Sequence, residues 1–316
     1  MKLSIVIPAL NEKENIGSTI EEILKSLGPS GDITGREVIV VDDHSTDGTF
    51  DAVMRLGMPE VRCVRLSRRC GSHTALRAGI KEASGDAVLC ISADGQDDPA
   101  CIRQMVDKWK SGARVVWALR KSRANEPWYI RKPAQAFYRL LTWLGGVDRT
   151  DIDISRASFC LLDSAVAAAV NACAERNTSL FGLILWLGFD HDCVEYERRM
   201  RRSGTSRWRF KQYVGLAKDW LIGFSGLPLT LMSVAGVLVT LAGAVYALGL
   251  VIGSMSGNEV SGWSMVMTAV LLLGGIQMVM FGVMGEYIWR NLDESRRRPL
   301  FFIEKRSSTD TKKGNT

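Results

Sequence analysis

The sequence predicts an α/β fold built on a doubly wound, mostly parallel sheet, followed by two apolar segments. Over residues 1 to about 118, short apolar runs that fit strands alternate with amphipathic runs that fit helices. This alternation is the order expected of a doubly wound sheet. Further along, residues 226–253 and 262–287 form two long apolar stretches that contain almost no charge.

Each predicted strand and helix rests on a local pattern in the sequence. The run from Ala87 to Ile91 is apolar and flanked by glycines, which is typical of a strand buried on both faces. From Asn15 to Leu27, apolar residues three and four positions apart indicate a helix with one buried face. Strands are predicted at 3–7, 37–41, 61–66, 87–91, 114–117 and 193–196, and helices at 15–27, 49–56, 73–83, 99–110 and from 164 to about 174.

Carboxylates follow three of the predicted strands at the points where the strands end. Glu12 follows the first strand, Asp43 the second and Asp94 the fourth. In an open parallel sheet, ligands bind outside the carboxyl ends of the strands. We therefore expect these three side chains to converge on one crevice.

The turn after the fourth strand is a candidate metal site. Asp94, Gln96, Asp97 and Asp98 crowd oxygen atoms at this point, and such ligands suit Mg²⁺ or Mn²⁺ carrying a ligand's phosphates. The same residues also fit a solvated acidic turn in which Asp98 caps a helix that begins at Pro99. The turn alone does not decide between these interpretations.

Several other classes of protein are disfavoured. A glycine-rich GxGxxG after the first strand and a Walker lysine motif are both absent from the sequence, which counts against NAD, FAD and P-loop nucleotide sites. The seven cysteines include no CxxC pair, so they fit reduced core residues better than disulfides or a zinc site. The basic run 198–209 would suit nucleic acid, but it precedes the apolar segments and fits an anionic membrane surface better. We expect no nucleic-acid partner.

The two apolar stretches predict a membrane hairpin. Each is long enough to cross a bilayer as a helix, and basic residues flank both outer ends. The predicted organisation is a cytoplasmic domain at 1–205, an interfacial amphipathic segment at 206–225, spans at 226–253 and 262–287, and a cytoplasmic basic tail at 288–316. The protein is then a multi-pass protein of the inner or plasma membrane.

The polar loops carry a specific resemblance. Residues 8–15 read PxxNExxN, residues 42–49 read DDxSxDxT, and the turn at Asp94 ends in Gln-Asp. These loops resemble those of family-two glycosyltransferases with the GT-A fold. One catalytic domain followed by two spans is similar to the polyisoprenyl-phosphate glycosyltransferases, relatives of dolichyl-phosphate mannose synthase and the bactoprenol glucosyltransferases. Processive polysaccharide synthases fit less well, because Arg207-Trp208 lacks the Gln of their QxxRW motif.

The resemblance implies transfer of a sugar from a UDP- or GDP-linked donor to an undecaprenyl or dolichyl phosphate. It implies that Arg120 and Arg131 bind the acceptor phosphate, and that Asp94 and Gln96 hold Mg²⁺ or Mn²⁺. Expected partners are the nucleotide sugar, the lipid and the membrane, with further copies of this chain left open. The residues implied for the nucleotide are Pro8, Ala9, Leu10, Glu12, Asp42, Asp43, Gly71 and Ala93.

The sequence also departs from the family pattern. Ser92 stands where the first Asp of the metal motif is usual, and Ser158 stands where an Asp often discussed as a base is usual. Asp151 and Asp153 are the alternatives for that base, and Asp153 is taken as a candidate catalytic residue. These changes leave open a catalytically altered scaffold, whereas a lipid-linked sugar transporter would need several copies of a two-span chain.

Overall fold

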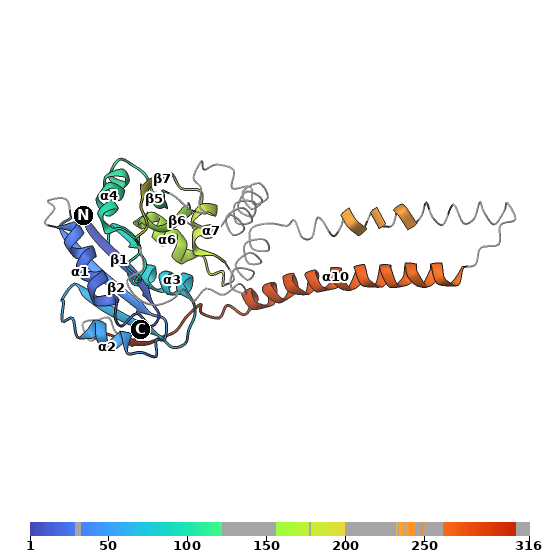
Figure 1. Ribbon diagram of the computed structural model, residues 1–316, viewed down its shortest axis with the longest axis horizontal. Coiled ribbons are helices and arrows are strands. Elements are labelled where there is room, and N and C mark those ends of the chain that lie inside the picture. The colour runs from blue at the N-terminus through green and yellow to red at the C-terminus, as the bar shows by residue number, and fades with distance from the viewer. Residues whose placement is uncertain are drawn as a thin grey trace. The chain divides into compact units, whose positions relative to one another are not determined.

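The computed structural model describes residues 1–28, 33–121, 156–176, 178–199, single positions between 232 and 248, and 262–307 (Figure 1). The chain divides into two compact units. The first contains Met1–Tyr213 together with Pro299–Thr316, and the second contains Val214–Arg298. The end of the chain thus belongs to the same unit as its beginning.

The first unit is built on one sheet. The strands of this sheet that the described residues form have the order β7-β5-β6-β4-β1-β2-β3-β8. Parallel pairing joins β1 to β2 and β4, β2 to β3, and β5 to β7, whereas β6 and β8 pair antiparallel to their neighbours. The predicted mostly parallel sheet is therefore confirmed. The strands are β1 (Lys2–Ala9), β2 (Gly35–Asp42), β3 (Val61–Leu66), β4 (Ala87–Cys90), β5 (Val115–Arg120), β6 (Ala157–Asp163), β7 (His191–Tyr196) and β8 (Ile303–Arg306).

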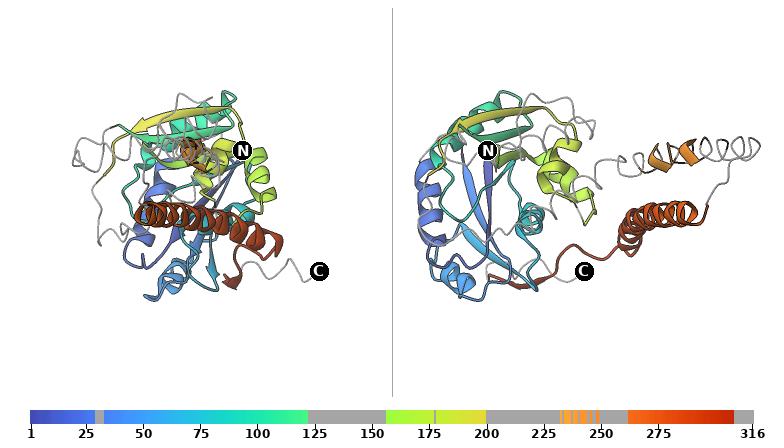
Figure 2. Two further views of the ribbon diagram at one scale, coloured as in Figure 1. Left: turned by 90° about the vertical axis from the view of Figure 1, so that its right-hand side faces the viewer. Right: turned by 45° about the vertical axis from the view of Figure 1, so that its right-hand side comes forward.

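Helices cover both faces of this sheet, as the views in Figures 1 and 2 show. On one face, α1 buries Ile16, Ile20 and Ile23 against apolar side chains of β1 and β2. On the other, α3 lies so close to β1 that a Cβ at Gly79 would sit 2.1 Å from a methyl group of Val6. The helices of this unit are α1 (Ile16–Leu27), α2 (Thr49–Met54), α3 (Ser72–Glu82), α4 (Ile102–Lys110), α6 (Ser164–Ala172) and α7 (Leu180–Trp186).

Three features differ from the sequence-based expectation. The helix predicted from Pro99 begins as a 3-10 turn, Pro99–Cys101, capped by the Asp98 carboxylate, which accepts from the Ala100 amide at 3.0 Å. Strand β6 was not predicted, and it inserts antiparallel between β4 and β5. Strand β8 lies within the region expected to be a basic tail. Both missed strands depend on pairing with distant segments, which local sequence patterns do not reveal.

The described part of the second unit consists mainly of α10 (Trp263–Ser295), a helix of 33 residues. Among the residues that the structure describes, no helix combines the length and the apolar character needed to cross a membrane. The predicted segment 206–225 and most of the predicted span 226–253 lie outside the described residues. The two-span organisation therefore stays a prediction.

Candidate active site

The sheet topology brings the polar loops to one edge. Strands β1, β2 and β4 run parallel, so their carboxyl ends, followed by Glu12, Asp43 and Asp94, share that edge. Strand β5 runs parallel to β4, because both are antiparallel to β6 between them. Arg120 at the end of β5 and Ser158 near the start of β6 therefore lie at the same edge, as the sequence predicts for Arg120.

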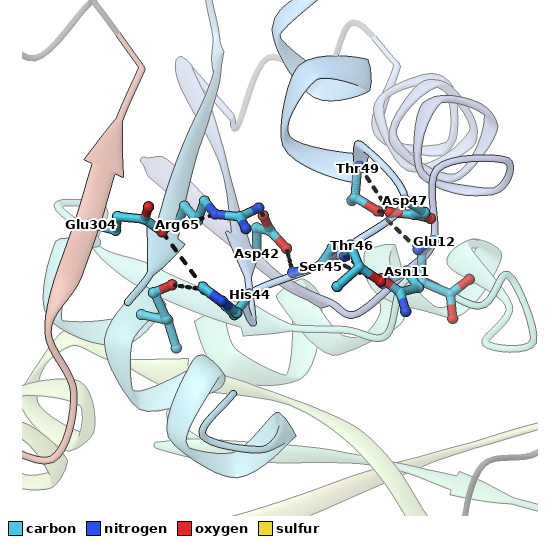
Figure 3. Close-up of polar contacts among 11 residues, drawn as sticks. Asn11, Glu12, Asp42, His44, Ser45, Thr46, Asp47, Thr49, Arg65 and Glu304 are labelled. Carbon is cyan, nitrogen blue, oxygen red and sulfur yellow. Dashed lines mark hydrogen bonds and ion pairs between the residues drawn. The ribbon is translucent and has the colours of Figure 1, made fainter. Parts of the chain in front are cut away.

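The loops after β1 and β2, residues 10–13 and 42–49, are bound to each other and are called here the paired loops (Figure 3). The amide of Asn11 donates to the Ser45 hydroxyl at 2.9 Å, and the Asn11 side-chain oxygen accepts from the Thr46 amide at 2.8 Å. The amide of Glu12 donates to the Thr49 hydroxyl at 3.1 Å. Asn11 has a positive φ of 53°, a conformation that asparagine tolerates better than most residues. Most of these bonds use a backbone amide, so they fix the course of the chain itself.

Asp47 reinforces the paired loops. Its carboxylate accepts from the Lys13 amide at 3.1 Å, from the Thr49 amide at 3.0 Å and from the Thr49 hydroxyl at 2.5 Å. Burial alone would raise the pKa of Asp47, but the hydrogen bonds from Thr49 and Lys13 outweigh it and lower the pKa below its usual value. The ionised carboxylate is thus the form that holds the loops together.

The two adjacent aspartates of the second loop have separate partners. Asp42 is fully buried, and its carboxylate accepts from the Ser45 amide at 2.8 Å and from the Arg65 guanidinium at 2.7 Å. Asp43 is also buried, and it accepts from the amides of Cys70 at 2.6 Å and Gly71 at 2.8 Å. Burial raises the pKa of Asp43, although these two amides act against the shift. The structure thus brings Asp43 and Gly71 together, as the resemblance implies.

The other residues implied for the nucleotide lie around these loops. Ala9 at the end of β1 is buried, and its carbonyl accepts from the Asp43 amide at 2.9 Å. The Glu12 carboxylate accepts from the Asn15 side-chain amide at 2.7 Å. Ala93 is buried, and its carbonyl accepts from the Thr19 hydroxyl of α1 at 3.2 Å. Pro8 lies within β1 and Leu10 directly follows it.

The turn after β4 is organised by Ser92. The Ser92 hydroxyl lies 2.7 Å from a carboxylate oxygen of Asp94 and 2.7 Å from one of Asp97. A hydroxyl has one proton and can donate to only one of them at a time. Burial raises the pKa of Asp97, although the hydrogen bonds from Tyr196 and Ser92 act against the shift.

A chain of side-chain bonds continues from Asp97 to Arg120. The Tyr196 hydroxyl at the end of β7 donates to Asp97 at 2.6 Å, and Tyr196 also has a side-chain hydrogen bond with Ser158. The Ser158 hydroxyl in turn accepts from the Arg120 guanidinium at 2.6 Å. We call this chain the Asp97 network; its members are Asp94, Ser92, Asp97, Tyr196, Ser158 and Arg120.

The segment after β7 covers the same turn. The Arg198 guanidinium donates to the Gln96 side-chain oxygen, and the Arg199 amide donates to the Gln96 carbonyl at 3.0 Å. Arg199 also pairs with Asp98 at 2.7 Å and with Glu22 of α1. Two arginines therefore bring positive charge to the turn that carries Asp94 and Gln96.

The residues of this turn offer a hard divalent cation only a small number of oxygen ligands. Within the described ranges, no group of three or more His, Cys, Asp or Glu side chains is placed to hold a metal. The Asp94 carboxylate and the Gln96 side-chain oxygen are the donors that remain from the predicted set. Mg²⁺ is commonly bound by one or two carboxylates plus water and substrate phosphates, so this small donor set suits it.

Some predicted site residues cannot be placed. Arg131 and Asp153 lie outside the described residues, as does Asp151. Conversely, sequence reasoning assigned no role to Tyr196, Arg65 or Glu304. Arg65 had a weak signal, because it is one of two arginines in a strand whose other residues are apolar, whereas nothing local distinguished Glu304.

Comparison with known proteins agrees with this fold. The chain resembles glucosyl-3-phosphoglycerate synthase from Mycobacterium tuberculosis in a complex with Mn²⁺, UDP-glucose and phosphoglyceric acid, at a TM-score of 0.50 and 18% sequence identity. That match covers 70% of this chain and 77% of the other. At this identity the likeness shows the fold alone.

Sequence relatives cover nearly the whole chain. An uncharacterized glycosyltransferase of Synechocystis sp. is 35% identical over 96% of this chain and 95% of its own. The bactoprenol glucosyl transferase of Shigella phage SfV is 33% identical over 96% and 98%. A prophage bactoprenol glucosyl transferase homolog of Escherichia coli is 32% identical over 96% and 99%. The family described as Glycosyl transferase family 2 matches residues 4–161. The chain therefore belongs to glycosyl transferase family 2 and is a glycosyltransferase.

Proposed function

We propose that this glycosyltransferase moves a sugar from a UDP- or GDP-linked donor to the phosphate of a polyisoprenyl lipid. The observation that carries the proposal is the Asp97 network, in which a carboxylate and a guanidinium at one sheet edge are joined by hydrogen bonds. Relatives of almost full length are named bactoprenol glucosyl transferases, which supports a lipid phosphate as the acceptor.

On the donor side, the paired loops and the turn at Asp94 form the proposed nucleotide-sugar site. Asp94 and Gln96 would hold Mg²⁺ or Mn²⁺, and a bound cation there neutralises the charge of the departing nucleoside diphosphate. Arg198 beside Gln96 adds a second positive group at the same turn. The paired loops supply a rigid wall, since their own amides are already bound to side chains.

On the acceptor side, the proposed roles fall to Arg120 and Arg131. A guanidinium binds a phosphate with two parallel N–H groups, which positions the oxygen that attacks the sugar. Because that oxygen is already anionic, the reaction needs positioning and charge neutralisation more than a strong base. The serine at position 158 is compatible with this chemistry, since here it orients Arg120 rather than accepting a proton. Asp153 remains the alternative candidate for a base.

We further propose that the protein acts at the inner or plasma membrane, with the first unit on the cytoplasmic side. Support comes from the two apolar stretches of the sequence and their basic flanks. In addition, α10 has large apolar side chains that are exposed, among them Val266, Met278, Phe281 and Ile288. An apolar surface of this kind suits a lipid environment.

The direct test is product formation by the full-length protein. It is incubated with a panel of UDP- and GDP-sugars, Mg²⁺ and undecaprenyl or dolichyl phosphate in vesicles, and transfer of labelled sugar to the lipid is measured. We expect one donor to label the lipid and a chelator to stop the reaction. Release of free sugar without lipid product would contradict the acceptor. Absence of all donor turnover would favour a scaffold, the alternative raised by Ser92 and Ser158.

A further inference from the structure

The last strand that the structure describes, β8, is part of the sheet that carries the proposed donor site. Strand β8 pairs antiparallel with β3, and its flanks extend the pairing: the Ser67 amide donates to the Phe302 carbonyl at 2.9 Å, and the Ser307 amide donates to the Cys63 carbonyl at 2.9 Å. Ser307 is itself buried. The segment that follows α10 is therefore attached firmly to the first unit.

One side chain of this strand reaches toward the paired loops (Figure 3). The Glu304 carboxylate accepts from Arg65 Nε at 3.0 Å and lies 3.7 Å from His44 Nδ1. Arg65 and Glu304 are 239 positions apart in the chain. His44 belongs to the paired loops and adopts a positive φ of 61°, and its ring also lies 3.2 Å from the Leu66 carbonyl. Glu304 therefore contacts one loop residue directly and a second one through Arg65.

Arg65 connects Glu304 to Asp42, because its guanidinium donates to both carboxylates. Because the guanidinium is planar, a partner on Nε fixes the direction in which the Nη atoms point. Nη1 of Arg65 donates to the Asp42 carboxylate at 2.7 Å, and that carboxylate accepts from the Ser45 amide. The Asp42 side chain is fully buried, so these partners take the place of solvent around its oxygen atoms. Ser45 then accepts from the Asn11 amide, which is one of the bonds between the two loops.

We propose that Glu304 is a positioning residue of the donor site, so that β8 contributes to nucleotide binding through this side chain. By holding Arg65, Glu304 sets the Asp42 carboxylate, and through Asp42 the course of residues 42–49. This inference rests on the proposed function, because it assigns the paired loops to the nucleotide of the donor. It predicts that donor affinity depends on a residue that lies beyond α10 in the sequence.

The structure offers a matched control on the same strand. Arg306 forms an exposed ion pair with Glu82 of α3 at 3.0 Å, and that pair does not involve the paired loops. Arg306→Ala removes the ion pair with Glu82, whereas Glu304→Ala removes the ion pair with Arg65 and the contact with His44. Glu304→Gln keeps an oxygen that can accept from Arg65 but loses the charge. Glu304 is partly exposed, with 38% of its side chain accessible, so these variants should fold.

The experiment measures binding of UDP and GDP with Mg²⁺ to the full-length variants by calorimetry, and steady-state kinetics with the lipid. We expect Glu304→Ala to weaken nucleotide binding roughly two- to thirtyfold, the range for a residue that acts through a network. Glu304→Gln should lose less nucleotide affinity than Glu304→Ala, and Arg306→Ala should bind the nucleotide as the parent does. The KM for the lipid should stay unchanged in all three variants. Equal nucleotide binding by Glu304→Ala and the parent would overturn the proposal.

Hydrogen exchange of the backbone amides provides a readout that needs no ligand. In Glu304→Ala, the amides of 42–49 should exchange faster, including that of Ser45, whereas Arg306→Ala should leave them unchanged. If the parent binds neither nucleotide, the proposed function fails, and the exchange result alone decides the positioning role. Unaltered exchange in Glu304→Ala would then overturn that role.

Discussion

The two halves of the candidate site are held together by different kinds of bond. In the paired loops, most of the bonds place a backbone amide against a side-chain oxygen. In the Asp97 network, the bonds run from side chain to side chain across the ends of β4, β5, β6 and β7. The first arrangement fixes the backbone, whereas the second fixes only where a few functional groups point.

This difference suggests how each half responds to change. A loop held by several amides loses only part of its support when one side chain is replaced, so the effect on its course is graded. A series of side-chain hydrogen bonds is interrupted when any one member is replaced, because each side chain is oriented by its neighbours in the series. We therefore expect single substitutions in the Asp97 network to affect the reaction more than substitutions in the paired loops, where the cost should fall mainly on stability.

The largest effect is expected at Asp94. Asp94→Ala removes the proposed cation ligand together with one end of the Asp97 network. We expect sugar transfer to fall by roughly 10²–10³-fold or more, the range seen when a group that stabilises transition-state charge is lost. The measurement is turnover of nucleotide sugar at saturating Mg²⁺. Asp51→Ala, at an exposed position of α2, is the control and should keep full activity.

Arg120 tests the other end of the network. Arg120→Ala should lower turnover and raise the KM for the lipid, with a total loss of about one to two decades, since a charged hydrogen bond contributes roughly 1.5–3 kcal/mol. Arg120→Lys should recover only part, because an ammonium lacks the planar fork. Donor binding is checked separately by calorimetry. A variant with weakened donor binding and a normal lipid KM would place Arg120 on the nucleotide side.

Tyr196→Phe breaks the middle of the network without changing its ends. The variant loses the hydroxyl that reaches Asp97 at 2.6 Å and keeps the ring that packs edge-on against Phe159. We expect a loss in kcat of roughly tenfold, equivalent to about 1.4 kcal/mol, with little change in donor affinity or melting temperature. If only the melting temperature falls, the network is structural and does not position the reacting groups.

The smallest effect on activity is expected for Asp47→Asn in the paired loops. It should destabilise the protein by about 1 kcal/mol at neutral pH, because it weakens bonds to an ionised carboxylate. The pKa of Asp47 is lowered in the folded protein, so its contribution is complete above its unfolded pKa of about 4 and is lost as the pH falls through the lower folded value. Melting temperatures of both proteins should therefore converge in that acid range. A gap that persists there would contradict this explanation.

Much of the parallel core could be predicted from sequence. Its strands are short apolar runs, and the position of Asp94 at the end of β4 follows from the run between Ala87 and Ile91. Because the carboxyl ends of parallel strands share one edge of a sheet, Glu12, Asp43 and Asp94 could be placed on that edge without any knowledge of their contacts. These features are local, or follow from one topological rule, and this is why the prediction was confirmed.

The rest of the site depends on contacts between distant parts of the chain. Tyr196 and Asp97 are 99 positions apart, and only the pairing of β7 with β5 brings the tyrosine near the turn. The resemblance implies that Asp42 binds the nucleotide, but it did not indicate that Arg65 and the Ser45 amide are its partners within the chain. A residue pattern can indicate which loop matters, but the choice of partner within the loop depends on packing that the pattern does not encode.

The position of β8 has a consequence for any shortened form of the protein. A strand with an unpaired edge exposes a row of amides and carbonyls that can pair with another chain, and this is a common route to aggregation. In the described sheet, β8 occupies the outer side of β3. A chain ending at residue 205 would leave that side of β3 open, although its sequence covers the whole predicted catalytic domain. Residues 299–307 therefore cover the outer side of β3 with a short, charged strand, and a shortened protein that lacks the apolar segments should keep them.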